Sequence, residues 1–303
     1  MLSTKTSSNF LGGLFICFFG AVCFSTKAVF VKLAYRDASV DAVTLLALRM
    51  IFSLPFFIIS AFAVTRQSNN VRFTKKQWIG VALIGCLGYY ISSLLDFIGL
   101  QYVTAGIERL ILFIYPTLVL VMSSVIFKEK IKPKQWLAVL ITYIGLMLAF
   151  YSELGVDRSQ NHNFYLGSVL IFICAITYAL YIVGSGRMIP SVGAAKFNSY
   201  AMSFASIGVL IHFFVSNNAS LLNLSLPVYI YSFLMAIFST VIPSYLVAEG
   251  IKRIGSDNAA IVGSVGPVST IIQAYFFLNE PILAMQIAGT ALILIGVLLI
   301  GKK

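Results

Sequence analysis

Ten long apolar runs divide this chain almost from end to end. A helix that crosses a lipid bilayer needs about 20 predominantly apolar residues, and these runs approach or exceed that length. Only 10% of the residues are charged, and 59% are apolar, whereas a soluble domain carries about 25% charged residues. The sequence therefore predicts an all-α integral membrane protein with ten transmembrane helices, at 10–31, 40–64, 77–98, 102–127, 135–151, 165–186, 195–215, 227–250, 258–278 and 282–301.

The cationic residues lie mainly on one side of this predicted topology. If the N-terminus is cytoplasmic, 15 of the 21 Lys and Arg residues fall in inner segments, as the charge bias of cytoplasmic loops requires. Three fall in outer segments, and Lys27, Arg49 and Arg109 lie within the apolar runs. Both termini are therefore expected in the cytoplasm. The same bias explains the net charge of +11, so no nucleic-acid partner is expected.

The sequence also contains an internal repeat. A shift of 151 aligns Gly99 with Gly250, Pro116 with Pro267, Glu129 with Glu280, Gln135 with Gln286 and Gly145 with Gly296, and a shift of 155 aligns Gly12 with Gly167 and Lys32 with Arg187. Each half holds five spans, an odd number, so the halves enter the membrane from opposite sides. We therefore expect two inverted five-helix repeats, at 1–151 and 165–303, joined by an outer loop at 152–164. Such repeats are typical of carriers with alternating access.

Two prolines occupy matching positions in the middle of the fourth and ninth spans. Pro116 and Pro267 each remove an amide donor and displace the carbonyl four residues earlier, at Leu112 and Gly263. Freed carbonyls at membrane depth need a partner from water, another helix or a ligand. These prolines are interpreted either as hinges beside a substrate cavity or as simple packing kinks.

Five ionisable residues are predicted to share a layer near the outer surface. At about 1.5 Å per residue, Arg49, Glu108 and Arg109 lie roughly 10 Å below it, Lys27 is shallower, and Asp96 lies near the outer end of its span. Ionisable groups at membrane depth are functional candidates by default. Three cations and two anions leave one positive charge without a counter-ion.

This layer has two interpretations. In a structural one, Glu108 pairs with Arg49 or Lys27, and Arg109 reaches a backbone carbonyl or a lipid headgroup. In a functional one, Arg49 or Arg109 binds the carboxylate or phosphate of a solute, and Glu108 neutralises an arginine or carries a proton. Lys27 is expected to snorkel to the interface. Glu108 and Arg109, adjacent on one helix, are expected to point to different faces.

Polar side chains within the spans are further candidates for the lining of a cavity. A phenol buried in a span needs a hydrogen-bond partner, and so does a hydroxyl. The candidate substrate-binding residues are Arg49, Tyr90, Ser93, Glu108, Arg109, Tyr115, Tyr178, Tyr181, Tyr245 and Ser264.

Enzyme and metal signatures are missing from the sequence. It holds no GxSxG, HExxH or P-loop pattern. Its four cysteines lie within apolar runs without a CxxC pair, and its two histidines are 50 residues apart. Neither catalysis, a metal nor a cofactor is expected.

The motifs around the two mid-span prolines resemble those of the EamA-type drug/metabolite transporter superfamily. The matching stretches are Gly99–Tyr102, Tyr115–Thr117 through Phe127–Glu129, and Gly266–Pro267 through Leu278–Glu280. Members often have Gly where this chain has Lys128 and Asn279. The resemblance implies a bacterial inner-membrane carrier with a central cavity that moves amino acids, other metabolites or toxic solutes, commonly outward.

The expected function is a secondary transporter that moves a small metabolite by alternating access, with export the favoured direction. Its expected partners are the lipid bilayer and an anionic or zwitterionic solute, with proton coupling as one option. A metabolite uptake or exchange carrier, for a nucleotide-like or zwitterionic substrate, is the alternative. A membrane scaffold or sensor that does not transport is a third class. No loop supports it, because none is long enough to hold a domain.

Overall fold

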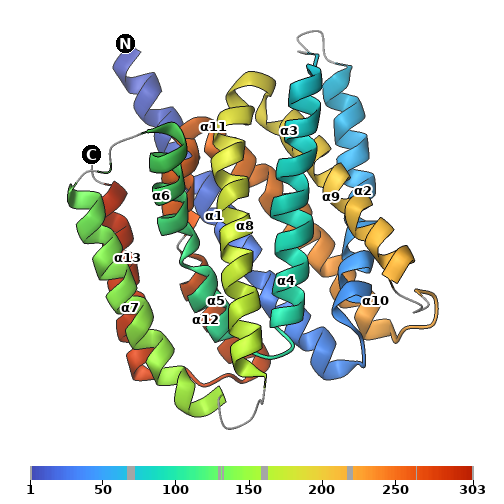
Figure 1. Cartoon of the computed structure of the whole chain (residues 1–303), viewed down its shortest axis with the longest axis vertical. Coiled ribbons are helices and arrows are strands. Elements are labelled where there is room, and N and C mark those ends of the chain that lie inside the picture. The colour runs from blue at the N-terminus through green and yellow to red at the C-terminus, as the bar shows by residue number, and fades with distance from the viewer. Residues whose placement is uncertain are drawn as a thin grey trace.

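The computed structural model of the chain is a bundle of helices (Figure 1). It describes residues 2–66, 72–128, 131, 133–157, 163–216, 221–263 and 265–301. The elements are α1 (Leu2–Asp37), α2 (Ala42–Thr65), α3 (Lys75–Gly85), the π-helical turn η1 (Cys86–Ile91), α4 (Ser92–Gly99), α5 (Ala105–Leu112), α6 (Tyr115–Phe127), α7 (Pro133–Asp157), α8 (Phe164–Val192), α9 (Ala194–Ser216), α10 (Leu226–Ala236), the π-helical turn η2 (Ile237–Val241), α11 (Ile242–Gly263), α12 (Gly266–Leu278) and α13 (Ala284–Gly301).

These elements form the ten predicted spans. Within the described ranges, seven helical stretches are long and apolar enough to cross a membrane. Three shorter apolar helices, at 136–145, 266–278 and 284–296, belong to the remaining spans. The seventh long stretch runs through Gly255, whose φ of 81° and ψ of 164° interrupt α11. The eighth span therefore ends before this glycine, and the ninth begins after it and continues into α12.

The two halves follow the same structural pattern at a shift of 151. The π-helical turns begin at Cys86 and Ile237, and α6 and α12 begin at Tyr115 and Gly266. The first positions of α3 and α10, and of α7 and α13, differ by the same shift. This agreement confirms an architecture of two five-helix repeats. It does not test where each repeat begins or ends, so those boundaries remain predictions.

The inverted symmetry that relates the two repeats also relates their helix contacts. α1 packs against α11 and α12, and its counterpart α8 packs against α4 and α6. α2 packs against α9, and α7 against α13. In the last pair, a Cβ added at Gly145 would lie 2.5 Å from the Gly289 carbonyl oxygen, and one at Gly296 would lie 2.7 Å from the Ala138 oxygen. Since these contacts are related by the shift of 151, the pseudo-two-fold axis passes between these helices.

Both prolines occupy the first turn of a new helix and do not kink a continuous one. Phe113 and Ile114 separate α5 from α6, and Pro116 follows at the start of α6. Pro267 has the same place in α12. A proline is tolerated there because the first helical turn has no use for its missing amide donor. The expected mid-helix kinks are therefore breaks, while the proposed hinge role remains a prediction.

Lys128 and Asn279 stop α6 and α12 with a left-handed residue. Their φ values are 56° and 57°, a region that glycine occupies without steric cost. This backbone conformation explains why glycine is common at these two positions in the family that the sequence resembles.

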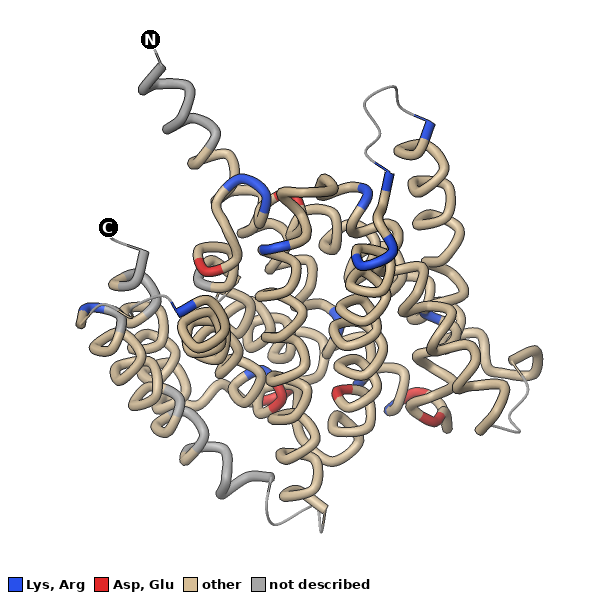
Figure 2. Tube along the Cα trace, turned by 45° about the horizontal axis from the view of Figure 1, so that its top comes forward, with Lys and Arg blue, Asp and Glu red and all other residues tan. Residues whose placement is uncertain are grey.

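The two ends of the bundle differ in charge. We name the end at which α1 begins the inner end, and the opposite one the outer end, after the predicted topology. Figure 2 shows Lys and Arg gathered mainly at the inner end. Local caps define the helix starts at the other end: Asp41 accepts hydrogen bonds from the amides of Val43 and Thr44, and Thr104 from that of Ile107.

Candidate functional site

A central cavity lies where the two repeats meet. Its lining comes from α1, η1, α4, α5, α6, α8, α11 and α12, and includes the cationic side chains of Lys27 and Arg109. The space open to the centres of water-sized molecules is about 50 Å³, room for about three to five waters. Both broken spans reach it, through Tyr115 at the start of α6 and Gly266 at the start of α12.

Aromatic side chains form one wall of this cavity. The ring of Tyr178 lies 5.2 Å from that of Tyr115 and 6.0 Å from that of Phe24, centre to centre. The Tyr115 hydroxyl donates a 3.1 Å hydrogen bond to the carbonyl of Ala260. Since Tyr115 begins α6 and Ala260 lies in α11, this bond joins the broken spans of the two halves.

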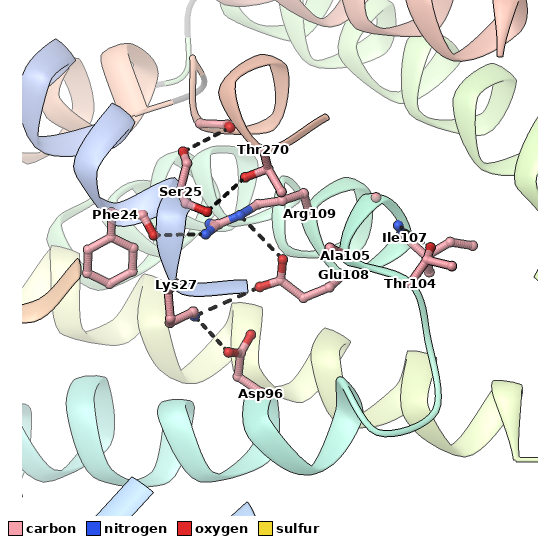
Figure 3. A network of polar contacts seen from close by, with 12 residues as sticks. Phe24, Ser25, Lys27, Asp96, Thr104, Ala105, Ile107, Glu108, Arg109 and Thr270 are labelled. Atoms are coloured by element: carbon pink, nitrogen blue, oxygen red, sulfur yellow. Dashed lines mark hydrogen bonds and ion pairs between the residues drawn. The ribbon is translucent and has the colours of Figure 1, made fainter. Parts of the chain in front are cut away.

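Four charged side chains lie beside the cavity in one buried cluster (Figure 3). Lys27 Nζ lies 2.7 Å from an Asp96 carboxylate oxygen and 3.8 Å from Glu108, and Arg109 Nε lies 3.3 Å from Glu108. Arg109 also donates a 3.0 Å hydrogen bond to the carbonyl of Phe24. These four side chains are at most 7% exposed, so the pairs join α1, α4 and α5 away from water.

The cluster corrects two expectations from the sequence. Lys27 does not snorkel, because its side chain is 4% exposed and paired inside the bundle. Glu108 and Arg109 contact each other despite their adjacent helix positions, because both side chains are long enough to bend together. The structural interpretation is right in two details: Glu108 lies within ion-pair distance of Lys27, and Arg109 reaches a backbone carbonyl.

The cluster contains two cations and two anions. Arg49 is the remaining cation of the predicted layer and lies outside the cluster. Its side chain is fully buried in α2, and Nε donates a 2.7 Å hydrogen bond to Thr240 in η2. The guanidinium lies 5.3 Å from the centre of the Phe97 ring. Neither terminal nitrogen has a hydrogen-bond partner within the described part of the chain. Such burial is costly, because an ionised group loses its hydration without full compensation.

At the outer end, Glu280 of the second repeat contacts the first repeat. Ala105 and Gly106, the first residues of α5, donate amide hydrogen bonds of 3.1 and 3.2 Å to the two carboxylate oxygens of Glu280. A carboxylate at a helix N-terminus is stabilised by the free amides and by the helix dipole. The second repeat therefore caps the broken span of the first.

The repeat-related place at the inner end holds a polar hollow. Ser256 and Asp257, the counterparts of Ala105 and Gly106, line it together with Ser123 and Arg187. Water-sized molecules have about 300 Å³ of space for their centres there. The Arg187 guanidinium lies 3.8 Å from the centre of the Phe127 ring. Among the described residues, the two repeat-related positions thus carry different side chains: Ala105 and Gly106 bind Glu280, and Ser256 and Asp257 line a hollow.

Comparison with known proteins decides the family. The sequence matches the EamA-like transporter family over residues 11–151 and 165–302. The chain belongs to this family.

Relatives of this EamA-like transporter carry the same broad description. It is 31% identical over 283 residues to the uncharacterized transporter YcbK of Bacillus subtilis (strain 168), a match that covers 91% of this chain and 88% of YcbK. A second B. subtilis protein, the uncharacterized transporter YyaM, is 26% identical over 80% of this chain and 78% of its own. A solved crystal structure superposes with a TM-score of 0.74 at 16% identity, covering 96% of this chain and 98% of that one. The last match shows the fold alone.

The EamA-like transporter brings four of the predicted site residues to the cavity wall. These are Ser93, Arg109, Tyr115 and Tyr178. Glu108 lies beside Arg109 in the cluster. Pro116 and Pro267 are buried one residue after the starts of α6 and α12.

Other predicted residues lie away from the cavity lining. The Tyr181 ring stacks 5.8 Å behind Tyr178, and Arg49 lies at η2. Tyr90 packs against His212 at 5.8 Å, and the Tyr245 hydroxyl shares a 2.9 Å hydrogen bond with Ser199. Ser264 lies outside the described residues.

Several cavity residues carried no usable sequence signal. Cys17 and Cys174 line the cavity, but a thiol in an apolar run reads as a small apolar side chain. Ser92 also lines the cavity. The sequence indicates this residue only through its position beside Ser93. Within the described part of the chain, no group of three or more His, Cys, Asp or Glu could hold a metal ion.

Proposed function

We propose that this membrane transporter is a secondary carrier for a small organic solute, an amino acid or a related metabolite, and that it works by alternating access. The observation that carries the proposal is the cavity between inverted repeats, reached by both broken spans. Inverted repeats give two packings of similar free energy, related by exchange of the halves. The broken helices supply segments that can move without unwinding a continuous span.

The difference between the two ends supports a state that is closed outside and hollowed inside. Glu280 caps α5 at the outer end, and the charged cluster joins α1, α4 and α5 near it. At the inner end the repeat-related residues line a hollow of about 300 Å³. With both termini in the cytoplasm, as the charge distribution favours, such a state loads solute from inside the cell, which is the direction of export.

We assign the moving parts to the segments that begin at Tyr115 and Gly266. Opening the outer end has to separate the Ala105 and Gly106 amides from Glu280. It also has to separate Lys27 from the carboxylates of Asp96 and Glu108, or to move these three side chains together. In this scheme Glu108 neutralises Arg109, and a proton taken up by Glu108 would weaken the cluster and favour opening.

Accessibility of a native cysteine tests alternating access without knowledge of the solute. Cys17 lines the cavity, while Cys86 lies at the start of η1 with its thiol 3.8 Å from the Phe204 carbonyl oxygen. One variant keeps only Cys17, with the other three cysteines changed to alanine. The matched control keeps only Cys86. Each is inserted into vesicles and treated from either side with a charged methanethiosulfonate that cannot cross lipid.

Cys17 is buried in this structure and Cys86 is partly exposed within a span, so Cys17 reacts only when the cavity opens to water. We expect Cys17 to react faster from the cytoplasmic side than from the outer side, and Cys86 to react slowly from both. Weakening the outer closure, with Glu280→Gln, should speed the outer reaction and slow the inner one. Simultaneous fast reaction from both sides would indicate a pore and contradict the proposal. So would a Cys17 that reacts no faster than Cys86 from either side.

A further inference from the structure

Arg49 is a fully buried cation that uses little of its hydrogen-bonding capacity among the described residues. Arg49 is 0% exposed, and its two terminal nitrogens have no hydrogen-bond partner among the described residues. None of the ion pairs between described residues includes it. A buried cation with two unpaired nitrogens is unfavourable unless a partner arrives in another step of the cycle.

A π-helical turn orients the guanidinium of Arg49. Thr240 accepts the Arg49 Nε hydrogen bond and donates its own hydroxyl proton to the Met235 carbonyl at 3.0 Å. The Phe97 ring lies 5.3 Å from the guanidinium carbon. With Nε held by Thr240, the remaining planar pair of nitrogens forms a fork that matches the two oxygens of a carboxylate.

Arg49 and Arg109 differ in how far their hydrogen-bonding capacity is used. Arg109 already donates to the Phe24 carbonyl and pairs with Glu108. Among the described residues, Arg49 makes a hydrogen bond only to Thr240. Of the two arginines that the sequence offers as anion sites, the structure favours Arg49.

Charge balance indicates the charge of the ligand. Lys27, Arg49, Arg109, Asp96 and Glu108 are all buried, and Arg49 interacts electrostatically with Asp96; with both carboxylates ionised, the sum of these five charges is one positive charge. A single negative charge neutralises it, whereas a phosphate dianion would reverse it. The low dielectric of the interior makes such imbalance costly.

Tyr89 lies near both Arg49 and residues of the cavity wall. Its neighbour Gly88 lines the cavity, and its ring packs 6.4 Å from Phe24 and 5.0 Å from Tyr181. Tyr89 also lies close enough to Arg49 to interact with it electrostatically. A solute in the cavity would therefore reach Arg49 by displacing the Tyr89 ring.

The geometry points to Arg49 as the binding site for the carboxylate of a monoanionic solute whose body occupies the aromatic cavity. This inference rests on the proposed transport function, since it names the solute class of that same cavity. Arg109, which lines the cavity and is already engaged by Glu108 and the Phe24 carbonyl, then holds the charged cluster together and does not bind the carboxylate.

Thermal unfolding of the detergent-purified protein tests the assignment with sodium benzoate as the probe. Benzamide supplies the same ring without the charge, and sodium chloride at equal ionic strength supplies an anion without the carboxylate. The variants are Arg49→Gln and Arg49→Lys. The matched control is Arg36→Gln, which removes an exposed guanidinium at the end of α1.

We expect benzoate, but neither benzamide nor chloride, to raise the melting temperature of the wild type and of Arg36→Gln, because a ligand of the folded state stabilises it. In Arg49→Gln the benzoate Kd should rise at least about tenfold. Arg49→Lys should fall between, since a lysine keeps the charge and loses the fork. Without ligand, Arg49→Gln should melt no lower than the wild type, because it removes an unpaired buried charge.

Three results would overturn the inference. Benzoate could fail to stabilise the wild type beyond chloride. It could stabilise Arg49→Gln and the wild type at the same Kd. Chloride could reproduce the full Arg49-dependent rise, which would make the site a halide site. In each case the Cys17 accessibility experiment can still show alternating access, so loss of this site and loss of the proposed function are distinguishable.

Discussion

The outer and inner ends of this transporter have the same backbone pattern and different side chains. At the outer end, Ala105 and Gly106 begin α5 under the carboxylate of Glu280. At the inner end, the equivalent Ser256 and Asp257 line a hollow. The repeat thus gives the two ends similar backbones, and the described side chains beside them differ; in the proposed cycle these ends are the outer and inner gates.

The charged cluster is the largest difference between the halves. Its members Lys27, Asp96, Glu108 and Arg109 correspond in the second half to Ile182, Val247, Ala259 and Ala260. Ion pairs in a low-dielectric region have strict geometric requirements, whereas small apolar contacts slide at little cost. The outer gate is therefore expected to open as a switch that breaks defined pairs, and the inner gate by gradual repacking.

Removal of Asp96 should have the largest effect on this comparison. Asp96→Leu leaves Lys27 buried without its 2.7 Å partner, which should cost about 3–5 kcal/mol of unfolding free energy. At the inner end, Glu249→Gln breaks the half-exposed pairs with Lys252 and Arg253 and should cost less than about 1 kcal/mol. Denaturant titration in mixed micelles measures both.

A double variant controls for loss of packing. Lys27→Met with Asp96→Leu removes both charges and should recover most of the stability, because a buried pair replaced by apolar groups is often neutral. If Asp96→Leu costs no more than Glu249→Gln, the outer cluster is not the stronger closure.

The contact between α7 and α13 should respond equally in the two halves. Gly145→Ala and Gly296→Ala each place a Cβ against a carbonyl oxygen of the opposite helix. Overpacking of this kind costs about 1–3 kcal/mol, and the two costs should agree because the symmetry axis passes between the helices. Thermal unfolding of both variants in one detergent is the measurement. A large difference between the two free-energy costs would mean that the twofold relation holds for the backbone but not for the packing of side chains.

Glu280→Gln should weaken the outer gate specifically. The amide keeps an oxygen for the α5 N-terminus but loses the charge, so we expect a loss of about 1 kcal/mol. The rate of Cys17 modification from outside should rise together with this loss. Asp257→Asn, at the inner counterpart of Gly106, is the matched control and should leave the outer rate unchanged. Equal effects of the two variants would remove the distinction between the gates.

The smallest effect concerns the two left-handed caps. Lys128 and Asn279 have φ values near 57°, but asparagine tolerates this region far better than lysine. Lys128→Gly should therefore stabilise by about 0.5–1 kcal/mol, while Asn279→Gly should be close to neutral. Melting temperatures of the two variants test this ordering, which the reverse result would contradict.

The helices could be predicted from the sequence because apolar length and the repeat register are local properties. The break at Phe113 could not. Pro116 is compatible with either a kink or a new helix, and the choice depends on distant contacts such as the Tyr115 hydroxyl on the Ala260 carbonyl. Gly255 lies in the connection predicted between the eighth and ninth spans, so the interruption there agrees with the prediction.

The charged layer could be predicted from depth, but its pairing could not. Depth along a helix follows from residue count, whereas pairing depends on the rotation of each helix about its axis. The sequence therefore predicts that Lys27 snorkels, whereas the structure pairs it with Asp96. Arg49 has no ion pair with a carboxylate among the described residues. Tyr245 met the same depth criterion and lies in a different polar group, with Ser199.

Distances between the repeats at both ends test the central claim most directly. Spin labels at the exposed positions Gln101 and Met285 report on the outer gate, and labels at Lys252 and Lys134, related to them by the shift of 151, report on the inner gate. Pulsed electron resonance in lipid nanodiscs should give two populations, one with the outer pair short and the inner pair long, and one with the reverse. Conditions that lengthen the outer pair should shorten the inner pair to the same extent. Pairs that are long together, or that stay fixed while solute is transported, would contradict alternating access between these two halves.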